Sequence, residues 1–234
     1  STATSTADTR YAWIKNALDE TRSKRPQLDA LSRFACLREL LVSGHTKQLH
    51  RVADLPLLEK LRLTRLGSPD LGFLEAVPKL WWLEFVLGGS NDLSAIASVD
   101  NLKHLEVCWV RGLGDLGFIS RCTNLQWLGI DRLKQVQNLP DFTRLKKLRA
   151  LSLCTLRSLK SVDSIEGALA LEWFGFGDAS NLKPEDFRRA LQAPSLKRAT
   201  VGFGSEKRDR LFEQIAAEYG IETEAKYEPF RYQS

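Results

Sequence analysis

The sequence predicts an α/β solenoid: an arc of about eight parallel strands on a concave face, with short helical segments behind them. Three observations predict it. A six-residue apolar pattern returns eight times at almost constant spacing, a second apolar series with a three-residue step lies between the returns, and the 234-residue chain is 43% hydrophobic without a long apolar run. Each unit is too small to bury its own leucines, so neighbouring units must stack to form one core.

The recurring pattern is Leu-x-x-Leu-x-Leu, with other apolar residues at some places. Side chains of a strand alternate between its two faces, so positions four and six point into the core while positions three and five face outward. The spacings between successive starts are 21, 22, 22, 23, 23, 23 and 25 residues. The pattern starts at Leu37, Leu58, Leu80, Leu102, Leu125, Leu148, Leu171 and Leu196.

A second apolar series recurs between the strands and predicts the back of each coil. Its members lie three residues apart, which suits a short 3₁₀ segment. Two examples are the series Leu71, Leu74, Val77, Leu80 and the series Leu116, Ile119, Cys122, Leu125. From Pro184 the sequence KPEDFRRAL predicts a true helix in place of this segment, which explains the longest spacing.

These repeats resemble the leucine-rich repeat family, in particular the short-repeat type of bacterial internalins and phosphatase-regulatory subunits, over residues 34–204. The resemblance implies one parallel sheet that lines the concave side of an arc. Repeats of this family usually carry Asn three residues after the third apolar position, where its amide bonds the backbone of the turn. This chain lacks the row of asparagines. We therefore expect the polar backbone groups of the turns to find other partners and the convex side to be irregular. In this chain the position of the family's Asn is occupied by Leu66, Gly88, Val110, Leu133, Leu156, Ala179 and Gly204.

The N-terminal end of the array is predicted to be a cap that hides the terminal leucines. Residues 1–7 are expected to be a disordered tail, and residues 8–33 an N-terminal helical cap that starts at Asp8. The apolar residues on one face of that helix would be Tyr11, Ile14 and Leu18.

Residues 205–234 are predicted to form the C-terminal cap. Its helix is expected to follow Ser205 and to end near Gly220, because glycine readily adopts the left-handed conformation that ends helices. The sequence GIET after it could add an edge strand.

The register predicts an open row of indoles on the concave face. Trp82 lies at the outward position three of its unit, whereas Trp81 falls on the rim. Adjacent strands are about 4.8 Å apart, so tryptophans on alternate strands would form a stripe roughly 20 Å long. Position three reads Glu39, Lys60, Trp82, His104, Trp127, Ala150, Trp173 and Arg198.

Small residues and charges are predicted beside this row. Gly129 and Gly175 leave space next to Trp127 and Trp173, so those two rings are expected to lie over bare backbone. The surrounding carboxylates are Glu84, Glu106 and Asp131, and the flanking cations are Lys60, Arg62, Arg65 and Arg198.

An aromatic row of this kind predicts a surface that holds another protein, because an indole brings a large apolar area at little rotamer cost. The carboxylates would pair with basic groups of the partner. His104 is expected to fill the gap between two indoles, with titration that tunes binding as the alternative. The predicted contact residues are Trp82, Trp127, Trp173, Trp109, His104, Glu84, Glu106, Asp131, Arg62, Arg65 and Phe203, with Trp109 and Phe203 at the edge.

Other hypotheses stay open at this stage. The indoles could serve only as surface packing, could be covered by the terminal sequence YEPFRYQS, or could mediate self-association. A nucleic-acid-binding surface is a further hypothesis, weakly supported because the net charge is only +5 and the signs are mixed along the chain. Its basic residues would be Arg65, Arg132, Lys134, Arg144, Lys146 and Lys147.

No pattern predicts catalysis, a metal site or a cofactor. The three histidines show no zinc spacing and the four cysteines form no Cys-x-x-Cys pair, so free thiols are expected. Nucleophile-elbow, P-loop and dinucleotide glycine patterns are missing. The start STATSTADTR lacks the layout of a secretory signal. We therefore expect a non-enzymatic cytoplasmic protein without a membrane segment, or a secreted effector that acts in a host cytosol.

Overall fold

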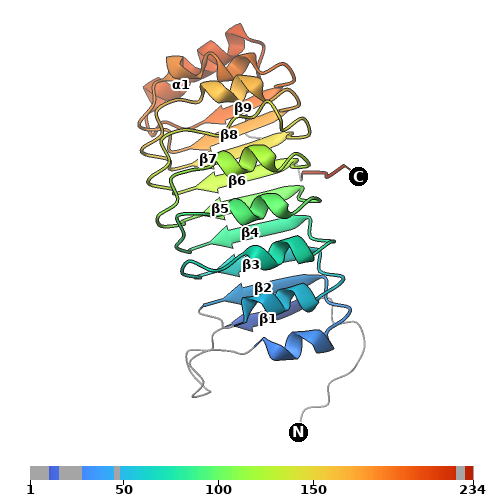
Figure 1. Ribbon diagram of the computed structural model, residues 1–234. Helices are drawn as coiled ribbons and strands as arrows, with labels where there is room; N and C mark the ends of the chain where they lie inside the picture. The colour runs from blue at the N-terminus through green and yellow to red at the C-terminus, as the bar shows by residue number, and fades with distance from the viewer. Residues whose placement is uncertain (1–10, 16–27, 45–47, 225–229, 234) are drawn as a thin grey trace.

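The computed structural model describes residues 11–15, 28–44, 48–224 and 230–233. Within them one parallel sheet runs in sequence order from β1 to β9, and its strands stack along the length of the molecule (Figure 1). The strands are β1 (Tyr11–Lys15), β2 (Glu39–Ser43), β3 (Lys60–Thr64), β4 (Trp82–Val86), β5 (His104–Cys108), β6 (Trp127–Asp131), β7 (Ala150–Cys154), β8 (Trp173–Gly177) and β9 (Arg198–Val201). The predicted solenoid of parallel strands is confirmed.

Neighbouring strands pair without any shift, so the same position of each repeat recurs along the sheet. Trp82 pairs with His104, and His104 pairs with Trp127. The leucines at position four of these strands, such as Leu105 and Leu128, are fully buried. This confirms the predicted register, with leucines inside and position three on the concave face.

Short 3₁₀ helices cover the convex side of the sheet and lie in front of it in Figure 1. Among the described residues they are η1 (Asp29–Arg33), η2 (Leu49–Asp54), η3 (Gly72–Ala76), η4 (Ser94–Ser98), η5 (Gly117–Arg121), η6 (Asp163–Gly167), η7 (Pro184–Phe187) and η8 (Ala190–Gln192). The three-residue apolar step therefore predicted these segments correctly. The single true helix expected from Pro184 is wrong, because the chain forms η7 and η8 there instead.

A side-chain carboxylate starts the convex segment in several coils. Asp70 Oδ1 accepts a hydrogen bond from the Gly72 backbone N–H, at 2.9 Å. The same bond joins Asp92 to Ser94, Asp115 to Gly117 and Asp141 to Thr143. It satisfies a backbone donor that the first turn would otherwise leave unpaired.

The turns after β2 to β7 are regular even though the row of asparagines typical of the family is missing. The residue that follows the strand adopts a left-handed conformation, as at Trp109, with φ of 55°. Its N–H bonds the next coil: that of Trp109 donates to the Asp131 carbonyl at 2.9 Å, and that of Arg132 to the Cys154 carbonyl at 3.0 Å. Apolar side chains such as Leu133 fill the core where the amide would lie. The coils thus satisfy the turn through backbone bonds to one another. The predicted irregularity holds only for the convex side, where the coil between β6 and β7 has no 3₁₀ helix.

The N-terminal helix predicted around Tyr11 and Ile14 is wrong in the described residues. Tyr11–Lys15 forms β1, which pairs in parallel with β2. Three-residue apolar spacing favoured a helix, but pairing with the first complete coil favours an extended chain. Residues 1–7, predicted to be a disordered tail, and Leu18 lie outside the described residues.

The C-terminal helix agrees with the prediction. α1 spans Glu206–Glu218, directly after Ser205, and buries Phe212. Gly220 follows the helix in a left-handed conformation, and the Ile221 N–H bonds the Ala216 carbonyl, a pairing typical of glycine-terminated helices. The edge strand expected in GIET is reduced to one parallel bridge, between Arg198 and Glu222. No helix in the described part of the chain has the length and apolar character needed to cross a bilayer.

The burial of each leucine predicts how much stability is lost when it is replaced by alanine. Leu151→Ala in β7 removes a fully buried side chain and should lower the free energy of unfolding by about 2–5 kcal/mol. The control Leu169→Ala removes a side chain that is 51% exposed and should change it by less than about 0.5 kcal/mol. Urea unfolding followed by circular dichroism measures both. Equal effects of the two substitutions would contradict the assigned register.

Candidate functional site

The indoles of the concave face lean along the sheet from position three toward position five. A Cβ added to Gly175 would lie 2.8 Å from the Trp173 ring, and one added to Gly129 would overlap the Trp127 ring. Both rings therefore lie over bare backbone, as the sequence predicted. Trp82 leans the same way and donates a hydrogen bond from Nε1 to Glu84 Oε1, at 2.8 Å. All three indoles are half-buried.

His104 fills the gap between two of these indoles. Its ring stacks on Trp82 with a centroid distance of 3.6 Å and on Trp127 with a centroid distance of 4.2 Å. The side chain is buried, and burial, with Lys60 nearby, lowers its pKa to about 3. The imidazole is therefore neutral at physiological pH. This favours the gap-filling role and not the alternative in which titration tunes binding.

Three carboxylates follow the indole row. Glu84 bonds Trp82 and forms an ion pair with Arg62 at 3.1 Å, and Asp131 pairs with Arg132 at 2.8 Å. Glu106 lies between them, and its pKa is raised by burial first and then by its two acidic neighbours. The centre of the concave face is therefore acidic.

The last described residues lie against this face. Tyr232 Oη is 2.6 Å from His104 Nδ1, and its ring packs against Trp81 and Trp82 at centroid distances of 5.1 and 5.8 Å. Phe230 in turn packs on Tyr232. In Figure 1 this segment lies beside β5 and β6, far from α1. The sequence left open whether the terminal segment covers the indoles. At the Trp82 end of the row, it does.

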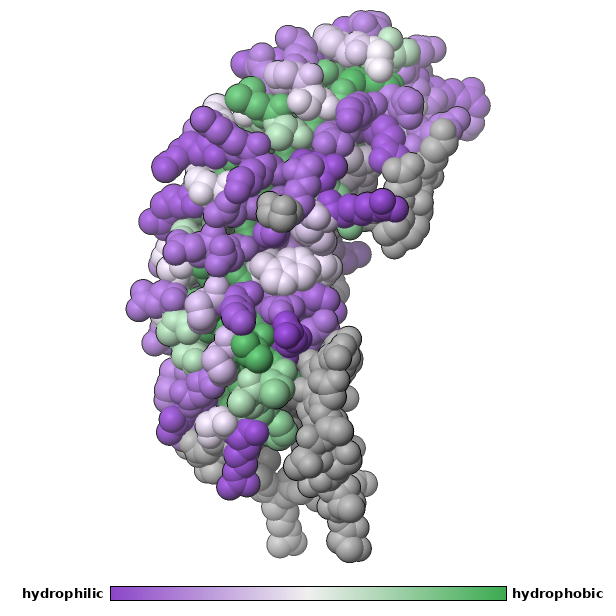
Figure 2. Space-filling view, turned by 90° about the vertical axis from the view of Figure 1, so that its right-hand side faces the viewer, coloured by the Kyte–Doolittle hydropathy of each residue, from purple (hydrophilic) through white to green (hydrophobic). Residues whose placement is uncertain are grey.

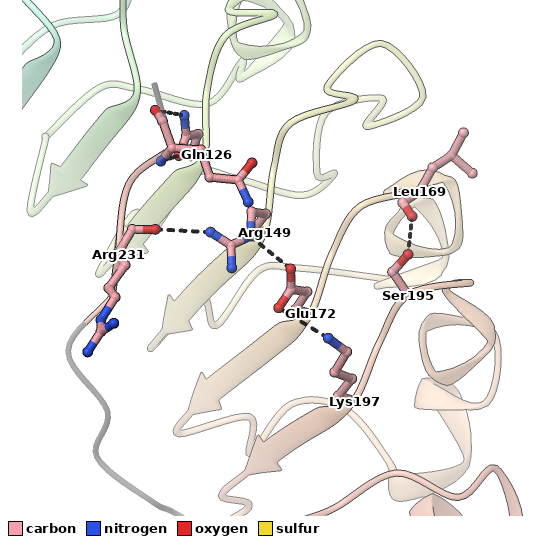
Figure 3. Close-up of polar contacts among 8 residues, drawn as sticks. Gln126, Arg149, Leu169, Glu172, Ser195, Lys197 and Arg231 are labelled. Carbon is pink, nitrogen blue, oxygen red and sulfur yellow. Dashed lines mark hydrogen bonds and ion pairs between the residues drawn. The ribbon is translucent and has the colours of Figure 1, made fainter.

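Polar contacts to the rim hold the terminal segment in place. The Gln126 side chain bonds both backbone groups of Gln233, accepting from its N–H at 2.7 Å and donating to its carbonyl at 2.9 Å. Lys103 Nζ donates to the same carbonyl, and Arg149 donates to the Arg231 carbonyl at 2.9 Å. Figure 3 shows the contacts of Gln126 and Arg149, with the Arg231 backbone carbonyl directed toward Arg149 and the Arg231 side chain pointing away from it. The residues at position two, directly before β5, β6 and β7, thus form a rim that holds the terminal segment, a role that the sequence analysis missed.

Basic side chains line a hollow next to this rim. The cavity of about 460 Å³ lies beside Lys146, Lys147, Arg149 and Lys197. Its one acidic lining residue, Glu172, bonds Arg149 at 2.8 Å and contacts Lys197 at 3.4 Å (Figure 3). Figure 2 faces the edge where the strands begin, and hydrophilic residues dominate it.

The predicted edge residues separate into two environments. Trp109 is 49% exposed and packs under the Arg132 guanidinium at 5.2 Å, at the end of β5. Arg65 occupies the equivalent place after β3. Phe203 was predicted to line the open edge, and this is wrong. It is buried against Phe187 and Phe212, because α1 covers the last coil.

No protein-family model matches the sequence, and no curated protein matches it significantly. Several solved structures are similar to this chain. Internalin C2 from Listeria monocytogenes is 15% identical, with a TM-score of 0.53, over 75% of this chain and 76% of that one. A leucine-rich repeat protein of Leptospira interrogans is 17% identical, with a TM-score of 0.51, over 83% of this chain and 56% of that one. The chain has the leucine-rich repeat fold. At these identities the likeness extends to the fold alone.

The basic residues of the nucleic-acid hypothesis do not form one surface in this leucine-rich repeat chain. Arg65 and Arg132 follow the ends of their strands, whereas Lys146 and Lys147 precede β7, and parallel strands place these ends at opposite edges. The Arg132 charge is also paired with Asp131. A phosphate backbone would therefore meet two separated basic groups and an acidic centre between them.

Burial of His104 predicts a specific pH response. The unfolded chain takes up a proton near pH 6.5, but the folded protein does so only near pH 3. The free energy of unfolding should therefore fall as pH drops through this window, because unfolding binds a proton there. In an NMR titration the His104 ring signals should stay constant from about pH 8 to pH 5. A midpoint near pH 6 would show that the imidazole is not enclosed by the two indoles.

Proposed function

We propose that this leucine-rich repeat chain is a protein–protein interaction module that binds a partner protein on its concave face. The row of half-buried indoles carries the proposal. The rings of Trp127 and Trp173 extend over the glycines at position five, and side chains of this type supply much of the binding energy at protein interfaces. In that role the protein would act as a regulator, an inhibitor or an effector in the cytosol.

The docked terminal segment supports the proposal, because it already uses the concave face as a peptide-binding surface. Tyr232 packs on two tryptophans, and Gln126 bonds both backbone groups of Gln233. Backbone recognition by a side-chain amide does not depend on the peptide sequence, so the same rim suits a partner's segment.

The docked segment also divides the face into a covered part and an open part. Tyr232 shields Trp82 and His104, so we no longer place Trp82 among the principal anchors. Beyond it lie Trp127 and Trp173, next to Gly129 and Gly175 and without a described residue of the segment in ring contact with them. We propose this second part as the main contact, with Trp109 at its edge.

The charges next to the open part favour a partner with basic groups. Arg62 neutralises Glu84, and Arg132 neutralises Asp131. Glu106 makes no hydrogen bond or ion pair within the described ranges, and its pKa is raised by burial first and then by repulsion from its acidic neighbours. A lysine or arginine of the partner would relieve this repulsion.

Replacement of the two open anchors tests the proposal. Loss of one well-buried indole should cost on the order of 2–4 kcal/mol of binding, so a Trp127→Ala, Trp173→Ala bait should lose the partner from a lysate pull-down. Leu169→Ala, an exposed change away from the indole row, is the matched control and should retain it. Mass spectrometry compares the proteins captured by the three baits.

Two outcomes would contradict the proposal. If the double variant captures the same proteins as the wild type, the indoles are not the contact. If capture falls steeply with salt and depends on nucleic acid, the electrostatic alternative holds instead. Sedimentation of the free protein at two concentrations shows whether the chain associates with itself, which distinguishes self-association from binding of a different protein.

A further inference from the structure

Two buried polar atoms at the centre of the concave face have no partner. Among the described residues, His104 Nε2 and Asp131 Oδ1 are buried without a hydrogen bond. His104 is only 4% exposed, so an unpaired ring nitrogen there is costly unless another group approaches it. Glu84 and Glu106 lie on the same two neighbouring strands as Trp82 and His104.

The His104 imidazole and two carboxylates converge. Glu84, His104 and Glu106 each offer one donor atom, and these three atoms all lie within 4.8 Å of one another. Tyr232 Oη occupies Nδ1, so Nε2 is the ring nitrogen without a partner and the one that we assign to the ion. One neutral nitrogen donor with two carboxylate oxygens is a ligand set that suits a divalent transition metal.

We propose that Glu84, His104 and Glu106 bind a divalent metal ion of the zinc type. Zinc ligands lie about 2.0–2.2 Å from the ion, so two of them are roughly 3.5 Å apart. Rotation of the two glutamate side chains would bring their oxygens to that separation, while stacking holds the imidazole fixed. Three protein ligands leave one position of a tetrahedral zinc ion for water or another group.

Surrounding residues already orient the three ligands. Trp82 Nε1 donates to Glu84 Oε1, and the rings of Trp82 and Trp127 fix the imidazole plane. With metal on Nε2, Nδ1 carries the proton and donates it to Tyr232 Oη, the kind of second contact that ligating histidines usually make. The ion would also neutralise the repulsion between the glutamates, which adds to burial in raising the pKa of Glu106. This proposal does not depend on the partner-binding proposal.

Arg62 is the natural competitor of the ion. Its Nε lies 3.1 Å from Glu84 Oε2 and supplies the positive charge that a metal would bring. Removal of this charge should therefore strengthen metal binding, whereas removal of a ligand should weaken it. Opposite effects from two neighbouring residues distinguish a coordinated ion from general attraction to an acidic surface.

Calorimetric titration of the chelator-treated full chain with zinc chloride tests the site. The wild type should bind one equivalent of zinc. Glu106→Gln should bind zinc at least about tenfold more weakly than the wild type, and Tyr232→Phe about tenfold more weakly. Arg62→Gln should bind more tightly. Glu166→Gln, which removes a carboxylate of η6 on the convex side, is the control and should match the wild type. Circular dichroism checks that each variant is folded.

Three results would overturn the proposal. The first is no saturable binding by the wild type at roughly millimolar zinc. The second is unchanged affinity in Glu106→Gln. The third is affinity that survives Glu106→Gln but is lost in Cys108→Ser, which would place the ion at the thiol near Asp131.

Discussion

In-register stacking of parallel coils is the constraint on which the rest of this structure depends. Every side chain at position three lies about 4.8 Å from its counterparts on the two neighbouring strands. Flat rings satisfy this spacing by lying face to face, which is how Trp82, His104 and Trp127 pack. The same stacking buries the imidazole and keeps it neutral. It also brings two glutamates of adjacent strands beside the remaining ring nitrogen.

The concave face combines an apolar surface with a polar rim. Indoles lie over backbone at the glycines, and position-two side chains extend along the edge where the strands begin. The chain's own terminal segment uses both features: Tyr232 packs on the rings while Gln126 and Arg149 hold the backbone. Partner binding and metal binding would occupy neighbouring regions of this face, and Tyr232 is the residue that touches both the aromatic row and the proposed metal ligand.

The repeat spacing predicted the strands, their register and the orientation of the indoles, because all of these follow from local periodicity. The N-terminal strand was not predictable in the same way, since its conformation depends on pairing with β2. Phe203 shared its repeat position with exposed residues, but α1 covers only the last coil. The contact between His104 and Tyr232 joins residues 128 positions apart, and nothing local indicates it. For the same reason histidine spacing along the chain gave no sign of a ligand cluster that adjacent strands assemble.

Proton NMR of the His104 ring measures the central stack most directly. An imidazole enclosed at 3.6 and 4.2 Å by two indoles lies in the shielding region of both rings. Its carbon-bound protons should therefore be shifted strongly upfield, with nuclear Overhauser effects to both Trp82 and Trp127. Ring protons at the shifts of a solvent-exposed histidine, without contacts to either indole, would contradict the stacked register.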